Sequence, residues 1–317
     1  MTMKNGKKLM QPTSTKLTLK ESVLSALAFF ALYDSPLHLQ RIRELLNQSA
    51  TLEEVQHILS KLVEDNKIFQ AGNLYSLKPW QASDYRDRQI EISKKWQKID
   101  SYYKWLAVLP FVRLVSVINS LSLGTADADS DIDFFVVTKN RRLYFVRSVI
   151  IVLFRLLGVY KTRERIKDKF CFGFFVTQNN LNLESLQIKP ADPYLDFWLA
   201  SMRPVVGGQQ YWELMQQNSW LRAKFPNFEP INRHATLKKT NIFLRTISLI
   251  LEILLYIPAE LAEPWLRRIH ITHTFKLAEN HAVTSTTVAN ATMLKLHAHD
   301  VRAQVANAHK DLLQSFR

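Results

Sequence analysis

Residues 117–138 read VINSLSLGTADADSDIDFFVVT, and this stretch decides the fold of the chain. It reads as a short apolar strand, a turn of small residues, an acidic loop, and a second apolar strand opened by Asp131 and Asp133. Residues i and i+2 of a strand point to the same face, so the two carboxylates project side by side while Ile132 turns to the buried face. Paired carboxylates on a rigid strand suit Mg²⁺, a hard ion usually held by one or two carboxylates together with substrate phosphates.

The spacing within this stretch resembles the signature of the polymerase-beta-like nucleotidyltransferase superfamily. That signature is a hydrophobic strand, a Gly-Ser turn, a spacer, and then Asp-hydrophobic-Asp; residues 121–130 form the spacer here. The motif of the minimal bacterial and archaeal branch of this superfamily resembles the stretch even more closely. Its turn corresponds to residues 119–124 and its Ser-Asp-Ile-Asp motif to residues 130–133.

The resemblance implies a Mg²⁺-dependent enzyme that transfers a nucleoside monophosphate from a nucleoside triphosphate to a hydroxyl acceptor. Asp131 and Asp133 would be the catalytic and metal-binding residues, holding one or two Mg²⁺ ions. The implied nucleotide-binding residues are Asn119, Ser120, Gly124 and Ser130. Arg141, in a basic turn directly after the second strand, is a further phosphate-binding candidate because a guanidinium offers forked donors, the alternative being a solvated basic turn.

Two features depart from the family pattern. Asn119 stands where the family has glycine, but asparagine is among the few other residues that tolerate positive φ, so the turn is expected to survive. The strand predicted at 170–177, where a third carboxylate is expected, contains no acid. Asp168 lies just before that strand, and Cys171 within it is predicted to be a small buried hydrophobe. The alternative function is therefore a catalytically weakened nucleotide-binding or regulatory module.

Composition limits the class of protein. A chain of 317 residues predicts two or three structural units, and 47% hydrophobic residues predict ordered cores. The net charge of +14 suits polyanionic partners, which are nucleoside triphosphates, nucleic acid or an anionic membrane. The single cysteine excludes an intrachain disulfide. Residues 1–17 are predicted to be a basic flexible tail without the apolar core of a secretory signal, and we expect a cytoplasmic protein.

The predicted fold class is α+β, a small mixed transferase sheet flanked by helices and preceded by a separate N-terminal domain. Residues 18–80 contain two capping boxes and a Gly-Asn turn between two short strands, a pattern of three helices and a hairpin that resembles a winged helix-turn-helix domain. The third helix, within 51–67, carries four acidic and two basic residues. Because cationic side chains dominate DNA binding, we expect no DNA binding here and favour a protein contact, with a DNA-binding regulator as the weaker alternative.

The remaining chain is assigned to a connecting helix (81–109), the nucleotidyltransferase core (110–180) and a helical C-terminal region (181–317) that the resemblance implies shapes the acceptor pocket. A basic run at 161–169 is predicted to be an exposed loop. Two apolar segments, 143–160 and 242–257, contain charges and fall short of the roughly 18 uncharged residues of a membrane span. Both are predicted to be buried helices, with a peripheral membrane contact by the second as the alternative.

Overall fold

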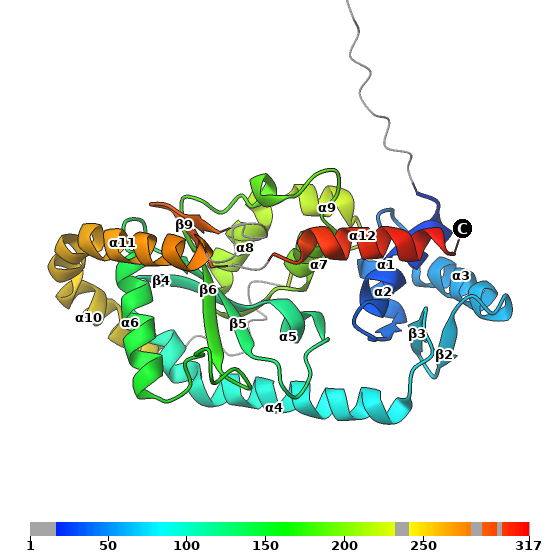
Figure 1. Cartoon of the computed structure of the whole chain (residues 1–317), viewed down its shortest axis with the longest axis horizontal. Coiled ribbons are helices and arrows are strands. Elements are labelled where there is room, and N and C mark those ends of the chain that lie inside the picture. Colours follow the sequence, from blue (N-terminus) through cyan, green and yellow to red (C-terminus); the bar gives the residue numbers. More distant parts are fainter. Residues whose placement is uncertain (1–16, 232–240, 280–286, 297–299, 317) are drawn as a thin grey trace, which may run out of the picture.

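The computed structural model describes residues 17–231, 241–279, 287–296 and 300–316, so nearly all of the predicted basic tail lies outside the described residues. The chain is α+β and contains two separate sheets. Figure 1 shows an elongated molecule. The smaller sheet and its helices lie at one end, the larger sheet lies in the middle, and helices α10 and α11 lie at the other end.

The N-terminal unit forms from local signals that the sequence displays. Both predicted capping boxes are present, Thr18 with Glu21 and Thr51 with Glu54, and they start α1 (Leu19–Ala31) and α3 (Leu52–Glu64). The other elements of this unit are α2 (Leu39–Glu44) and the strands β1 (Leu37–His38), β2 (Phe69–Ala71) and β3 (Leu74–Ser76). The three strands form an antiparallel sheet in the order β1-β3-β2, in which β2 and β3 are the predicted hairpin.

Helix α4 (Ala82–Ala107) joins the N-terminal unit to the central sheet and runs along the lower edge of the molecule in Figure 1. Its 26 residues span about 39 Å. Ile92, Ile99, Tyr103 and Leu106 form its buried face and pack into the core beneath the central sheet. The helix therefore touches both units of the molecule.

The central sheet is mixed and has the strand order β7-β4-β5-β6-β9-β8. Its members are β4 (Val112–Val117), β5 (Ile132–Thr138), β6 (Phe170–Thr177), β7 (Arg203–Val206), β8 (Val288–Ala289) and β9 (Met293–Lys295). Strands β4 and β5 are antiparallel, and β5 and β6 are parallel. The connections are α5 (Asn119–Leu123) after β4 and α6 (Leu143–Leu156) after β5. The end of β4 and the starts of β5 and β6 therefore meet at one edge of the sheet.

The C-terminal region, predicted to be helical, also contributes strands: β7, β8 and β9 come from it and extend the central sheet on both sides. These strands have two to four residues, too few to show an alternating pattern. Pro204 within β7 is tolerated because β7 is an edge strand. The helices of this region besides α10 and α11 are η1 (Glu184–Leu186), α7 (Pro193–Ser201), α8 (Gly208–Gln217), α9 (Trp220–Lys224) and α12 (Arg302–Gln314).

Helices α10 (Ile242–Leu254) and α11 (Tyr256–Glu279) correct the prediction of a buried helix at 242–257. The Glu252 carboxylate of α10 faces the protein, where it accepts a hydrogen bond from the backbone N–H of Phe111 at 2.9 Å. The apolar side chains of Ile253 and Leu254 face outward instead. No helix in the described part of the chain is by itself long and apolar enough to cross a membrane; α10 and α11 pass that test only as a pair, bent by 70°.

Candidate functional site

The segment predicted as a turn forms the short helix α5, and the backbone is left-handed at its first residue and at the residue that follows its end. Asn119 has φ of 56° and Gly124 has φ of 78°, so the asparagine adopts the conformation for which glycine is usually needed. The Ser120 carbonyl accepts hydrogen bonds from the N–H groups of Thr125 at 2.8 Å and Ala126 at 3.1 Å. The Ser120 hydroxyl is half-buried and makes no hydrogen bond within the described residues.

The two predicted acids meet at the start of β5. Asp131 immediately precedes the strand and Asp133 lies within it, both partly exposed, while Ile132 between them is buried. The Asn119 side-chain amide donates a hydrogen bond of 3.0 Å to Asp133 Oδ2. One ligand atom each from Asp131, Asp133 and Cys171 lie within 4.8 Å of one another. The structure thus brings the acid pair and the β4–α5 turn together into a group that could hold a metal ion.

Cys171 joins the acids because of strand pairing. Strand β6 runs parallel to β5, and the register places Cys171 beside Asp133. The strand expected to carry a third carboxylate therefore presents a thiol in that place. Burial and the negative charge of Asp133 raise the pKa of the Cys171 thiol well above its usual value, so it stays protonated at neutral pH. The sequence interpretation of Cys171 as a buried hydrophobe missed this contact with the acids.

Asp168, the other candidate for a third acid, has a different partner. The Lys95 ammonium of α4 is buried and donates hydrogen bonds to Asp168 Oδ1 at 2.5 Å and to the Ser130 carbonyl at 2.8 Å. The sequence placed Lys95 in the connecting helix predicted at 81–109, with no role at the site. Lys95 lies one turn from Ile92 and from Ile99, on the buried face of α4. This spacing in the sequence could have predicted that Lys95 is buried.

The Ser130 side chain shapes the acidic loop before β5. Its hydroxyl donates a hydrogen bond of 2.6 Å to Asp127 Oδ1, and the backbone N–H of Ser130 donates to the same oxygen at 2.8 Å. These bonds and the contact from Lys95 fix the backbone immediately before Asp131. In this structure Ser130 therefore positions an acid, and its hydroxyl is already used within the loop.

Lys161 also belongs to the site, although the sequence predicted an exposed loop at 161–169. Its ammonium nitrogen lies 2.5 Å from Asp131 Oδ2. The chain brings it there because Tyr160 bridges to Phe170 and the Lys161 N–H donates to the Phe170 carbonyl, which places Lys161 alongside the start of β6. Burial disfavours the ammonium, but Cys171 and Asp131 outweigh that effect and raise the pKa of Lys161. One cation thus partly offsets the two carboxylates.

The electrostatics of the acid pair favour a further cation. Burial and the neighbouring Asp131 raise the pKa of Asp133 to about 6, although the Asn119 amide opposes the shift. Two carboxylate ligands within 4.8 Å fit one hard ion such as Mg²⁺, whose remaining positions would be filled by phosphate oxygens and water. A protonated thiol is a poor ligand for Mg²⁺, so the residues present do not complete an oxygen set for a second ion.

Arg141 lies far from this group. It follows the opposite end of β5, and the strand alone from Asp133 to Thr138 spans about 16 Å. The Arg141 guanidinium forms an exposed ion pair with Glu260 of α11. Its nearness to the acids in sequence misled the prediction, because the strand between them carries the chain away from the site.

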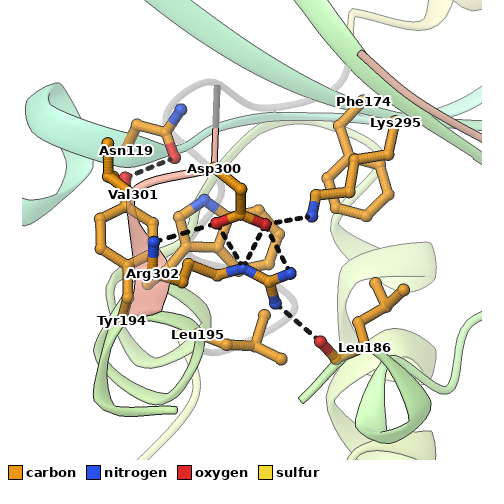
Figure 2. Close-up of a pocket in the computed structure, with 10 residues that line it drawn as sticks. Asn119, Phe174, Leu186, Tyr194, Leu195, Lys295, Asp300, Val301 and Arg302 are labelled. Atoms are coloured by element: carbon orange, nitrogen blue, oxygen red, sulfur yellow. Dashed lines mark hydrogen bonds and ion pairs between the residues drawn. The ribbon is translucent and has the colours of Figure 1, made fainter. Parts of the chain in front are cut away.

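A pocket opens next to Asn119 (Figure 2). Its volume is about 490 Å³ including the open mouth. The Tyr194 hydroxyl lies 3.4 Å from Asn119 Oδ1, which connects the pocket to the acid pair because Asn119 also holds Asp133. The other lining residues are Phe174, Leu186, Leu195, Trp198, Lys295, Asp300, Val301 and Arg302. The pocket therefore combines aromatic walls with a cluster of charges.

The charged cluster of the pocket is organised around Asp300 (Figure 2). Its carboxylate accepts a hydrogen bond of 2.7 Å from Arg302 Nη2 and lies 3.4 Å from Lys295 Nζ. Arg302 Nη1 donates to the Leu186 carbonyl at 2.7 Å and to Asp192 at 2.9 Å. The contacts that bury Arg302 join segments more than 100 residues apart, so no local pattern in the sequence reveals this cluster.

The chain matches no protein-family model, no curated protein and no solved structure. The chemistry of the site is therefore argued from its own residues. Those residues are two carboxylates, an amide, a thiol and an ammonium at one edge of the central sheet, with an aromatic pocket beside them.

Proposed function

We propose that this protein is a Mg²⁺-dependent nucleotidyltransferase that transfers a nucleoside monophosphate from a nucleoside triphosphate to a hydroxyl acceptor. One observation carries the proposal. Asp131 and Asp133 lie side by side with ligand atoms within 4.8 Å, next to the Asn119–Gly124 segment, whose two end residues have left-handed backbone. This is the arrangement that the resemblance to the polymerase-beta-like superfamily implies.

Different residues of the site would bind the metal ion, the phosphates and the base. Asp131 and Asp133 would hold one Mg²⁺, which would supply positive charge to neutralise the phosphates. The Ser120 hydroxyl, which has no hydrogen bond within the described residues, is available to donate to a phosphate. Lys161, next to Asp131, supplies a positive charge to the same phosphates. Trp198 in the adjoining pocket offers an aromatic wall for a base.

The reaction consists of one displacement at phosphorus. The acceptor oxygen attacks the α-phosphorus, the bond from that phosphorus to the bridging oxygen breaks, and pyrophosphate leaves with the bridging oxygen. A third carboxylate would usually take the proton of the acceptor hydroxyl. Cys171 occupies that place as a protonated thiol, so the proton passes to the solvent or to the leaving pyrophosphate. We therefore expect slow turnover.

The second candidate function is a nucleotide-binding module that regulates a protein partner. The thiol at Cys171 and the ion pair between Lys161 and Asp131 favour it, since both lower the negative charge available to a metal. The N-terminal unit, whose three helices and small sheet resemble a winged helix domain, would then supply the protein contact. The acidic residues of α3 favour protein over DNA as its partner.

The test is incubation of the full chain with each α-labelled nucleoside triphosphate and Mg²⁺, with and without a cell extract as a source of acceptor. Label transfer and pyrophosphate release by the parent protein, lost in Asp131→Asn/Asp133→Asn, support the transferase. The matched control is Asp129→Asn, an acid of the same loop whose side chain is 92% exposed, and it should retain activity. Nucleotide binding without release supports the regulatory module, and full activity in the double variant refutes the assignment of the site.

A further inference from the structure

Helices α10 and α11 form a lobe at the end of the molecule opposite the N-terminal unit (Figure 1). Among the described residues, nineteen large apolar side chains are exposed, and twelve of them belong to these two helices. The twelve are Ile242, Phe243, Leu249, Ile250, Ile253, Leu254, Tyr256, Ile257, Leu261, Trp265, Ile269 and Phe275. Monomeric proteins in water rarely expose so concentrated an apolar surface, so this outer face fits a partner.

The apolar side chains follow one stripe along both helices. On α11, Ile257, Leu261, Trp265 and Ile269 recur every four residues, so each lies about one turn from the next. The stripe continues past the junction at Leu255, where the helix axis bends by 70°. Helix α10 is therefore amphipathic with its apolar face directed away from the protein, and α11 adds exposed apolar side chains to the same outer surface.

Polar contacts fix this orientation. The sequence from Ile242 to Lys276 contains three acids, and all three bind the protein side. Glu252 pairs with Arg113 at 2.7 Å, and Glu260 pairs with the buried Arg142 at 2.6 Å. Glu263 accepts hydrogen bonds from the backbone N–H groups of Tyr144 at 3.0 Å and Phe145 at 2.7 Å. Turning the apolar face inward would break these contacts. The contacts of the three acids therefore hold the apolar side chains on the outside of the molecule.

The exposed charges of the lobe have a single sign. Between Ile242 and Lys276 the exposed charged side chains are Arg245, Arg267, Arg268 and Lys276, and all are cations. A tryptophan and aliphatic side chains on one face, with arginine and lysine beside them, is the composition of helices that lie in the membrane interface. Anionic lipid headgroups attract such cations.

We propose that α10 and α11 dock this protein onto the surface of a membrane that contains anionic lipids. The apolar stripe lies at the boundary between headgroups and acyl chains, and the four cations lie at the level of the headgroups. The helices lie on the membrane and do not cross it, because their three acids bind the protein and hold one face of both helices against it. This inference holds whether or not the central site transfers nucleotides.

A second copy of the chain fits this surface less well. A two-fold interface places the same patch of both copies face to face. The cations of one copy would then oppose those of the other, with no exposed acid of the described 242–276 segment to pair with them. Charge complementarity therefore favours an anionic lipid surface over self-association.

The experiment measures flotation of the full-length protein with vesicles of phosphatidylcholine alone and of phosphatidylcholine mixed with phosphatidylglycerol. We expect association with the anionic vesicles to be at least about tenfold stronger and to fall as salt is raised. Ile253→Asp/Leu261→Asp, at sites 76% and 75% exposed, should fold normally and lower association by more than about tenfold. The control is Phe69→Asp, 45% exposed in β2 at the opposite end of the molecule, which should bind like the parent.

Several outcomes would overturn the proposal. These are no association with either vesicle, equal association with both, or the same loss in the control variant. A dimer seen by light scattering without vesicles, and dissociated by Ile253→Asp/Leu261→Asp, would assign the lobe to a second copy. Bound protein that alkaline carbonate fails to extract would assign a membrane-spanning arrangement and overturn the interfacial one.

Discussion

Replacing Lys161 by glutamine should have opposite effects on two ligands of the acid pair. The Lys161 ammonium lies 2.5 Å from Asp131 Oδ2, so it competes with a divalent cation for that carboxylate. Lys161→Gln should therefore tighten the binding of the cation alone. The same ammonium supplies positive charge to the phosphates in the proposed function. The variant should therefore weaken the binding of a nucleoside triphosphate.

The magnitude follows from the charges. A divalent ion held by both acids would lie about 4 Å from the ammonium, where a charge of two and a unit charge repel each other by about 8 kcal/mol at an effective dielectric constant of about 20. The Lys161 side chain is 34% exposed and can swing into water, which reduces the repulsion that remains. We expect a gain of about 1.4 to 3 kcal/mol, which is about a tenfold to a hundredfold tighter Kd for the cation.

The assay is titration with Mn²⁺, followed by electron paramagnetic resonance, and calorimetric titration with a nucleoside triphosphate. Lys167→Gln is the matched control, because Lys167 belongs to the same segment but lies 3.9 Å from the exposed Asp129. An unchanged Mn²⁺ affinity in Lys161→Gln, or an equal gain in the control, would refute competition at Asp131. Parallel changes for Mn²⁺ and nucleotide would show that Lys161 does not face the phosphates.

Three further predictions concern stability. Glu252→Ala should lower the free energy of unfolding in urea by about 2 to 4 kcal/mol, because it leaves the buried N–H of Phe111 without an acceptor and a guanidinium without its partner; Glu252→Gln should lose less. Burial lowers the pKa of His270 to about 4, so between pH 6.5 and 4 the unfolded state binds a proton that the folded state does not, and stability falls as pH falls. Unfolding measured across this range should show a shallower slope in His270→Gln, and equal slopes would contradict the prediction. Cys171→Asp should lower Tm in chelator and recover it in Mg²⁺, because a third carboxylate repels the acid pair until an ion binds; Cys171→Asn should show no such dependence on the ion.

The parts of the structure that the sequence predicted are those encoded by neighbouring residues. The left-handed Asn119 turn and the paired acids of β5 follow from spacing within one stretch of chain. The capping boxes at Thr18 and Thr51 are also local patterns, and both helices start where those patterns place them. Strand β6 has the predicted limits because its apolar run is long, with charged residues before it and polar Gln178, Asn179 and Asn180 after it.

The parts that the sequence did not predict depend on contacts between distant segments. Cys171 and Lys161 reach the acids through the parallel pairing of β5 with β6, which no local period reveals. Arg141 was placed near the site because sequence distance is a poor guide to position across a strand. The outward face of α10 was missed because an apolar helix has the same pattern whether its apolar side meets a core or a partner, and only the partners of Glu252 distinguish the two.

Helix α4 makes the N-terminal unit and the acid pair mechanically dependent on each other. Arg88 donates hydrogen bonds of 2.9 Å to the carbonyls of Tyr33 and Asp34 in the N-terminal unit. Lys95 lies two turns further along the same helix, about 10 Å away. It donates a hydrogen bond to the carbonyl of Ser130, the residue before Asp131. A displacement of this helix would therefore move the backbone next to a proposed metal ligand, so a change in the N-terminal unit would alter the geometry of the acid pair through α4.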